Sequence, residues 1–296
     1  MTPATVVDPA APGRQGGPPG RRLVVNADDF GLSAGVNAGI AEMAEAGVVT
    51  STSLMVNTPG FDDALRRAER LGPRFGIGLH LNLTTGAPVV LAASVPTLVD
   101  RAGRFLPLAA LVRRMLRGGV RAGDVGREAE AQLARLRASG IVPTHADSHR
   151  HVHAFAVVRG ALWAASRTAG VPAVRRPLEP LWARPASAAG VVKRGLVAAA
   201  WAVPAHGTAV AAGTASFRGI ALLGSPTYQG DLLALLDALP EGSTELMVHP
   251  GRNDPSVAGW DTYIAQRAVE LAALLSAPVR ERLLGGGLAL VPFGAA

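Results

Sequence analysis

The sequence predicts one α/β domain whose strands form a (β/α) barrel with irregular or missing units. Three observations predict this fold. Short runs with the composition of strands alternate with helix-length segments, as in a largely parallel sheet with helical crossovers. The helix-length segments repeat their apolar residues with the helical period. The chain has 296 residues, of which 49% are hydrophobic, so it can bury one sizeable core. A doubly wound sheet is the alternative.

Seven segments have the length and pattern of strands. They are residues 22–26, 48–56, 76–82, 142–148, 172–176, 244–248 and 288–292. The segments between them carry apolar stripes at helical spacing, namely Val36, Ile40 and Met43; Phe61, Leu65 and Ala68; and Val125, Ala129, Leu133 and Leu136. On the last of these helices we expect the charged residues, Glu128 among them, to face solvent. Residues 177–214 are rich in Ala, Pro and Trp and are interpreted as an insertion or helical excursion without an assigned role.

The first part of the chain differs from the rest in composition. Residues 1–20 are rich in Pro, Gly and Ala and lack the basic start and apolar block of a secretory signal, so we expect a disordered leader before a domain spanning residues 21–296. A cytoplasmic location is expected for the same reason. No run of about 18 uninterrupted apolar residues occurs, and the sequence therefore predicts no transmembrane segment.

Composition also limits the chemistry. The chain has no cysteine, so disulfides, thiolate metal sites and thiol nucleophiles are excluded, and His, Asp or Glu must hold any metal. The net charge is +7, but the 29 Lys and Arg residues are scattered along predicted helices, which does not indicate a nucleic-acid partner. A basic surface still leaves an anionic substrate or a membrane surface open.

Two adjacent carboxylates follow the first predicted strand. Asp28 and Asp29 stand where residues 22–26 run into Phe30 and Gly31, which is the carboxyl end of a strand. Active sites of parallel α/β folds lie at that edge. Adjacent side chains on a strand end point different ways, so one carboxylate is expected to bind a metal and the other to accept a proton. A turn with a helix cap is the alternative interpretation.

A histidine lies near the end of the third predicted strand. In the run from Gly76 to Asn82, alternation places His80 on the same side as Gly78 and Asn82. Small or polar neighbours favour a ligand or an acid–base role, whereas a structural histidine is the alternative.

The densest signal is a histidine cluster at residues 144–153, which contains four of the seven histidines. If this segment stays extended, one face carries His145, Asp147, His149, His151 and His153. Imidazoles brought this close repel one another when protonated, unless a metal or carboxylates hold them. One Asp and two His form a facial set that leaves coordination positions open for water and substrate, as in catalytic sites.

A further polar residue also stands at the end of a predicted strand. His249 stands where the apolar run from Leu246 to Val248 meets Pro250 and Gly251, so in a barrel it would converge with Asp29 and His80 on one mouth. Other patterns fail: the sequence has no P-loop and no GxSxG elbow. Glycines 31, 35 and 39 recur every four residues, which suits close helix packing and not a dinucleotide loop.

With these elements, the chain resembles the YdjC-like carbohydrate deacetylases, which include the chitooligosaccharide deacetylases. The resemblance spans residues 22–293. Five motifs carry it, in order: NADDFGLS at residues 26–33, GVVTSTSLMVN at 47–57, GLHLNLTTGAP at 78–88, PTHADSHRHVH at 143–153 and MVHPG at 247–251. The resemblance implies an irregular TIM-type barrel with one divalent ion. Residues 177–214 match nothing in the family pattern, which leaves the choice of substrate open.

The resemblance also implies roles for single residues. It implies that the metal ligands are Asp29, His80 and His149, that Asp28 is the general base and that His249 is the general acid. Arg175, in the VRRP segment, matches a position where the family often has a basic residue, and we assign it to substrate binding together with His151 and His153. None of the metal-binding positions departs from the family motifs.

These roles predict removal of the N-acetyl group from an amino sugar, an oligosaccharide or a glycoconjugate. The expected cofactor is Mg²⁺, although the same donors accept Zn²⁺, Mn²⁺ or Co²⁺. The expected partner is the N-acetylated sugar, and a homodimer is left open. Two other functions also stay open at this stage: a metal-dependent phosphoester hydrolase and a sugar-binding barrel without catalytic activity.

Overall fold

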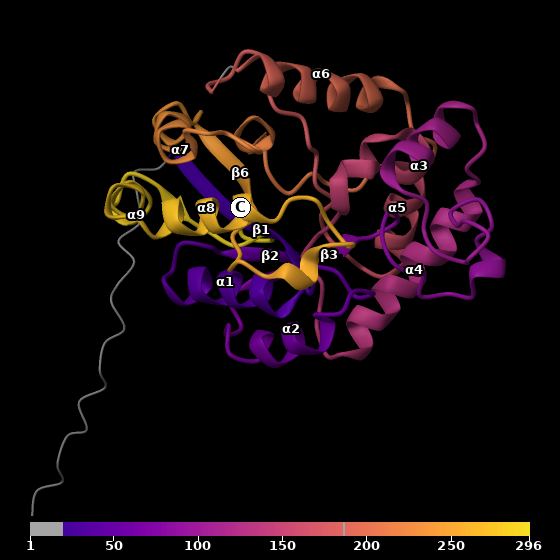
Figure 1. Ribbon diagram of the computed structural model, residues 1–296. Coiled ribbons are helices and arrows are strands. Elements are labelled where there is room, and N and C mark those ends of the chain that lie inside the picture. Colours follow the sequence, from indigo (N-terminus) through magenta and orange to yellow (C-terminus); the bar gives the residue numbers. More distant parts are fainter. Residues whose placement is uncertain (1–19, 186) are drawn as a thin grey trace, which may run out of the picture.

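A parallel β-sheet forms the centre of the structure, a computed structural model that describes residues 20–185 and 187–296. In Figure 1 helices surround the strands on several sides. The strands are β1 (Arg21–Phe30), β2 (Ser51–Leu54), β3 (Gly76–Leu81), β4 (Ala146–Ser148), β5 (Ser216–Arg218), β6 (Gly242–Val248) and β7 (Ala289–Leu290). The expected leader, residues 1–20, falls outside the described residues except for Gly20.

The helices follow the strands in alternation. They are α1 (Ala34–Glu45), α2 (Phe61–Ala68), α3 (Leu108–Leu116), α4 (Ala122–Ala138), α5 (Ala156–Thr168), α6 (Ala188–Ala202), α7 (Tyr228–Asp237), α8 (Ala265–Leu275) and α9 (Ala277–Leu284). Short 3₁₀ turns lie at η1 (Ala92–Ser94), η2 (His149–Ala154), η3 (Ile220–Leu222) and η4 (Pro255–Val257). No helix in the described ranges has both the length and the apolar character needed to cross a membrane.

All strand pairs are parallel, in the order β4-β3-β2-β1-β6-β5, with β7 beside the first residues of β1. This confirms the predicted α/β class. Single bridges at Val174 and Ala211 extend the sheet beyond β4, but within the described residues no pairing joins Ala211 to β5. The sheet is therefore a curled half-barrel, and a closed TIM-type barrel is not observed. The expected strand at residues 172–176 is not a strand in the structure. Only Ala173 and Val174 pair, each through a single bridge.

The apolar stripes predicted from the sequence form the core. Ser33 caps α1 by accepting the Val36 N–H, and Val36, Ile40 and Met43 are completely buried. On α4 the whole predicted stripe is buried, whereas the expectation for Glu128 is wrong. Its carboxylate is buried and accepts the backbone N–H groups of Val89 and Val90, which fixes the loop before η1.

The glycines of α1 allow a close approach to the loop that follows β6. A Cβ atom at Gly39 would lie 2.6 Å from the Cα of Gly251, and one at Gly35 would lie 2.5 Å from the Cβ of Asp254. The spacing of four therefore does serve close packing, although the partner is a loop and not a second helix. This loop begins at His249, so α1 helps to position that residue.

We expect Gly39→Ala to lower the free energy of unfolding by about 2 kcal/mol, because the added methyl group meets backbone atoms that cannot rotate away. Urea titration followed by circular dichroism measures this. The matched control is Gly126→Ala on α4, where an added Cβ meets no atom within 4 Å. It should leave stability unchanged or raise it by up to about 1 kcal/mol. Equal stabilities of the two variants would show that the close approach does not exist.

Candidate metal centre

The polar residues predicted at the strand ends do meet at one edge of the sheet. Asp28 and Asp29 lie near the end of β1, His80 lies in β3 directly opposite Asp147 of β4, and His249 follows β6. Because all these strands are parallel, their carboxyl ends share one rim.

An irregularity in β1 separates the two adjacent carboxylates. The pairing register between β1 and β2 shifts between Ala27 and Phe30, and Asp29 has a φ of 70°, in the left-handed region. Such bulges re-aim side chains next to active sites. Asp28 consequently faces Arg175, whereas Asp29 faces His149 and Arg267. The predicted difference in direction is confirmed.

Asp29, His80 and His149 form a compact buried group. Asp29 Oδ1 lies 3.2 Å from Nε2 of His80 and 2.8 Å from Nδ1 of His149. One potential ligand atom from each residue lies within 4.8 Å of the others. The centres of the two imidazole rings are 5.6 Å apart, and the ring planes form an angle of 69°. One carboxylate and two imidazoles at this spacing can hold a single divalent ion and leave positions open.

The surroundings of this group also fit an ion. His80 directs Nδ1 to Asp147 Oδ1 at 2.6 Å, so its Nε2 is left for a ligand, an arrangement typical of metal-binding histidines. The buried Nε2 of His149 has no hydrogen-bond partner among the described residues. Burial disfavours charge on His80, but Asp147 and Asp28 outweigh it and raise the pKa of the imidazole to about 10. The pocket around His80 therefore favours a positive charge.

A second group, Asp28, His80 and Asp147, has similar spacing. The guanidinium of Arg175 already fills it: its two terminal nitrogens lie 2.6 Å from the oxygens of Asp28, and Nη1 lies 2.7 Å from Asp147 Oδ2. Arg175 binds both oxygens of Asp28, whereas Arg267 binds only Oδ2 of Asp29 and leaves Oδ1, so this group is a poorer cation site than the first. Asp29, His80 and His149 are therefore the better candidates for metal ligands.

Arg175 is completely buried among carboxylates. Besides Asp28 and Asp147, it contacts Glu245 Oε1 through Nε at 2.7 Å. Burial disfavours its charge, but Asp147, Asp28 and Glu245 together raise its pKa well above the ordinary value. Burial also raises the pKa of Glu245 to about 8, against the opposing effect of Arg175. The structure places Arg175 where it orients Asp28, and not on an open surface.

The sequence predicted one face for the histidine cluster if the segment stayed extended. In the structure it is not extended over its whole length. Strand β4 ends at Ser148, and Arg150 and His151 have φ values of 56° and 51°, which turn the chain into η2. The five residues therefore do not share one face. Asp147 and His149 reach the site, but His145 stacks on Phe293, with ring centres 3.9 Å apart. Burial lowers the pKa of His145 to about 3, so this ring is neutral.

The other two histidines of the cluster line the wall beside the site. His153 is completely buried, with Nδ1 2.6 Å from Ser148 Oγ and its ring against Trp201. His151 is half-buried between the rings of His153 and Phe217. Burial lowers the pKa of His151, and the positive charges of Arg175 and nearby histidines, His249 among them, add to the effect. Of the two, only His151 is partly open to solvent.

His249 lies at the rim, held by Glu270 of α8. Glu270 accepts the backbone N–H of His249 at 2.7 Å and the hydroxyl groups of Tyr228 and Tyr263. The imidazole Nδ1 lies 3.9 Å from Glu270, the ring contacts Tyr263, and 13% of the side chain is exposed. The backbone of His249 is thus held in place, and its ring, whose Nδ1 has no hydrogen-bond partner among the described residues, is partly open to solvent.

Sequence reasoning missed the cation behind Asp29. Arg267 of α8 donates from Nη2 to Asp29 Oδ2 at 2.6 Å and to Asp261 at 2.7 Å. Burial opposes ionisation of Asp29, but His149 and Arg267 outweigh it and hold its pKa well below the ordinary value. Arg267 occupies Oδ2 and leaves Oδ1 to the two histidines. The sequence does carry a signal that Arg267 is buried, because Arg267 shares a helix face with the buried Leu271 and Leu274.

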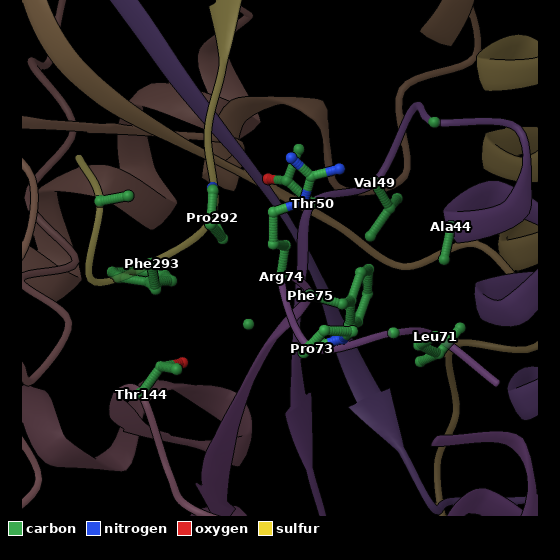
Figure 2. A pocket seen from close by; sticks show the side chains of 14 residues that line it. Ala44, Val49, Thr50, Leu71, Pro73, Arg74, Phe75, Thr144, Pro292 and Phe293 are labelled. Carbon is green, nitrogen blue, oxygen red and sulfur yellow. The ribbon is translucent and has the colours of Figure 1, made fainter. Parts of the chain in front are cut away.

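A separate cavity of about 510 Å³ lies at the opposite end of the sheet. Figure 2 shows the side chains that line it. Its lining includes Thr144, just before β4, the first residue of β3, and Pro292 and Phe293 after β7, so it opens at the amino ends of the strands. Arg74 is the charged residue in this lining, which holds neither histidine nor carboxylate. This cavity therefore does not serve the metal centre.

Comparisons with known proteins show which family the chain resembles over most of its length. A family model described as YdjC-like protein matches residues 22–284. The carbohydrate deacetylase of Geobacillus stearothermophilus is 35% identical over 92% of this chain and 97% of its own length. A human protein of the same name is 35% identical over 92% of this chain and 90% of its own. Among solved structures, a putative cellobiose-phosphate cleavage protein from Enterococcus faecalis V583 superposes with a TM-score of 0.73 at 27% identity, covering 93% of this chain and 98% of that one.

Proposed function

The chain belongs to the YdjC-like protein family, and on that premise we propose that it is a carbohydrate deacetylase, a hydrolase that removes the N-acetyl group from an amino sugar. The observation that carries this function is the buried group of Asp29, His80 and His149, with a second carboxylate, Asp28, and a rim imidazole, His249, around it. Amide hydrolysis needs a polarised carbonyl, a base for water and an acid for the amine. The site has a candidate for each.

Asp29, His80 and His149 would hold one divalent ion. When bound, such an ion polarises the acetamide carbonyl and lowers the pKa of a water molecule toward neutrality. Asp147 keeps the His80 ring oriented and Arg267 keeps Asp29 oriented, so the protein fixes the ligands before an ion arrives.

Asp28 is the proposed general base. Its carboxylate is held by Arg175 and by Asn26 Nδ2, which donates at 2.8 Å. Two carboxylate oxygens offer about four acceptor positions, so these donors leave room for a proton from water. As that water attacks the acetyl carbon, Asp28 accepts its proton at a carboxylate oxygen. Arg175 then acts by positioning Asp28.

His249 is the proposed general acid. It transfers a proton to the sugar nitrogen as the carbon–nitrogen bond breaks, which releases acetate and a free amino sugar. Its fixed backbone and partly exposed ring suit a group that must be reprotonated from solvent in every turnover. His151, on the half-open wall, is a proposed contact to the sugar, and His153 supports it from behind.

Several finer features remain proposals. They are the choice of Mg²⁺, the cytoplasmic location, a homodimer, a role of the buried Arg175 in substrate binding that acts through Asp28, and assignment of the half-barrel to the irregular TIM-type barrels. The ends of β1, β3, β4 and β6, which share one rim, support the last of these.

The test is acetate release from a panel of N-acetylated sugars, with and without a chelator. We expect hydrolysis that stops when EDTA removes the ion and returns when Mg²⁺, Mn²⁺, Co²⁺ or Zn²⁺ is added back. Matched phosphoesters serve as the comparison. Activity on phosphoesters alone would identify a phosphoester hydrolase, and binding of sugars without acetate release would identify a sugar-binding protein; either result contradicts the proposed function.

A further inference from the structure

The exposed apolar residues of the molecule are concentrated on one segment. Among the described residues, ten large hydrophobic side chains are exposed. Half of them lie between residues 181 and 203: Leu181, Trp182, Val192, Leu196 and Val203. The last three recur at spacings of four and seven on and just after α6, so they form one stripe of the helix. We call this group, with the loop at residues 181–184, the α6 surface.

The opposite stripe of α6 is packed against the protein. Gly190 and Arg194 are buried, Val197 packs on the cluster of Phe217, Ile220 and Met247, and Trp201 contacts His153. The helix therefore has one face packed against the protein, and its opposite face belongs to the α6 surface. Figure 1 shows α6 along the outer edge of the molecule.

Arg194 makes the α6 surface a fixed element. Its buried guanidinium donates to the carbonyl oxygens of Ala183 and Pro185 at 2.7 and 3.2 Å, so the loop that carries Trp182 is tied to the helix. The indole of Trp182 is nevertheless 78% exposed, and Leu196 is 68% exposed. Contiguous exposed apolar patches on a rigid frame mark interaction sites.

Basic side chains flank this surface, and the carboxylate of Asp231 lies across the cavity beside it. The sequence contains no Asp or Glu between Glu179 and Asp231, and Glu179 is itself buried. Arg184 and Lys193 are exposed beside the apolar stripe, and the whole chain carries a net charge of +7. An apolar stripe flanked by basic residues fits a surface of anionic lipid headgroups. With 15 residues, α6 is about 22 Å long, too short to cross a bilayer core of about 30 Å, so it would lie along the surface.

The α6 surface also adjoins the catalytic rim. A cavity of about 770 Å³ lies between Trp182 and Lys193 on one side and residues 223–227 on the other. Gly224, in its lining, donates its N–H to the hydroxyl of Tyr263, whose ring contacts His249. The wall of this cavity is thus linked through Tyr263 to the proposed acid.

We propose that the α6 surface docks on an anionic lipid surface, and that the N-acetylated amino sugar is presented there as the headgroup of a lipid-anchored molecule. The docking stands on the exposed stripe and its charge, whereas the nature of the substrate rests on the proposed function. Trp182 and Leu196 insert among the headgroups, and the basic side chains bind lipid phosphates.

Flotation of the whole protein with vesicles tests the docking. We expect binding to vesicles of phosphatidylglycerol and phosphatidylcholine, and much weaker binding to phosphatidylcholine alone. The double variant Trp182→Ala with Leu196→Ser should bind at least about tenfold more weakly. The matched control is Leu91→Ser with Leu116→Ser, which removes equally exposed apolar side chains elsewhere and should bind like the wild type. Absence of wild-type binding, or equal binding of both double variants, overturns the proposal.

Two further measurements separate lipid docking from the proposed function and from a dimer interface. All variants should release acetate from a soluble N-acetylated sugar at the wild-type rate, whereas the Trp182 and Leu196 variant should lose most of its rate on an N-acetylglucosamine lipid embedded in vesicles. Vesicle binding without acetate release from any sugar would contradict the proposed function and leave the docking intact. If instead ultracentrifugation without lipid shows a wild-type dimer and a monomeric variant, the α6 surface is an interface between copies, and the proposal is wrong.

Discussion

Replacing His80 with alanine should abolish metal binding and acetate release together. In the structure His80 lies between Asp147 and Asp29, and its Nε2 is the nitrogen that remains for an ion. Without the ring, the site keeps one carboxylate and one imidazole, too few protein ligands for a stable catalytic site. We expect less than about 1% of wild-type turnover, since the ion supplies several kcal/mol of transition-state stabilisation.

Metal content after gel filtration, measured by inductively coupled plasma spectrometry, and the rate of acetate release should fall in parallel. His206→Ala is the matched control, because His206 is exposed and lies outside the site. It should keep both metal and rate. Thermal melting separates this effect from misfolding. A folded His80 variant that retains stoichiometric metal would remove His80 from the ligand set.

Asp28→Asn should lower kcat by about 10² or more while the metal stays bound. The amide cannot accept a proton from water at neutral pH, yet its shape preserves the space between β1 and Arg175. Asp28 does not belong to the group of Asp29, His80 and His149, so metal content should not change. A normal rate in this variant would remove Asp28 from the role of base.

The variant also weakens the ion pair with Arg175, and Glu245→Gln controls for that. Glu245 is buried and contacts the same guanidinium, so Glu245→Gln removes one carboxylate from Arg175 and leaves Asp28 in place. We expect this variant to stay within about threefold of the wild-type rate, because Asp28 and Asp147 still hold Arg175. If both variants lose activity equally, the loss comes from the displaced Arg175 and not from a missing base.

The sequence predicted the site best where strand ends determine it. Asp28, Asp29, His80 and His249 come together because parallel strands place their carboxyl ends on one rim, and this follows from the alternation of strands and helices alone. The buried stripes of α1 and α4 follow in the same way from the helical period.

Features that depend on backbone turns or on distant partners were not predicted. The positive φ angles of Arg150 and His151 break the extended face that alternation implied for the histidine cluster. Glu128 is buried because a loop from another part of the chain needs an acceptor for its N–H groups. Arg267 reaches Asp29 across 238 residues of sequence, so the helical period could indicate that Arg267 is buried but not that Asp29 is its partner.

Crystals grown with Mn²⁺ or Zn²⁺ and measured at the absorption edge of the metal would test the central claim most directly. We predict a single anomalous peak about 2.0–2.3 Å from Asp29 Oδ1 and from one nitrogen each of His80 and His149. A peak held instead by Asp28 and Asp147, or a fully active enzyme with no peak at either group, would contradict the proposed metal centre.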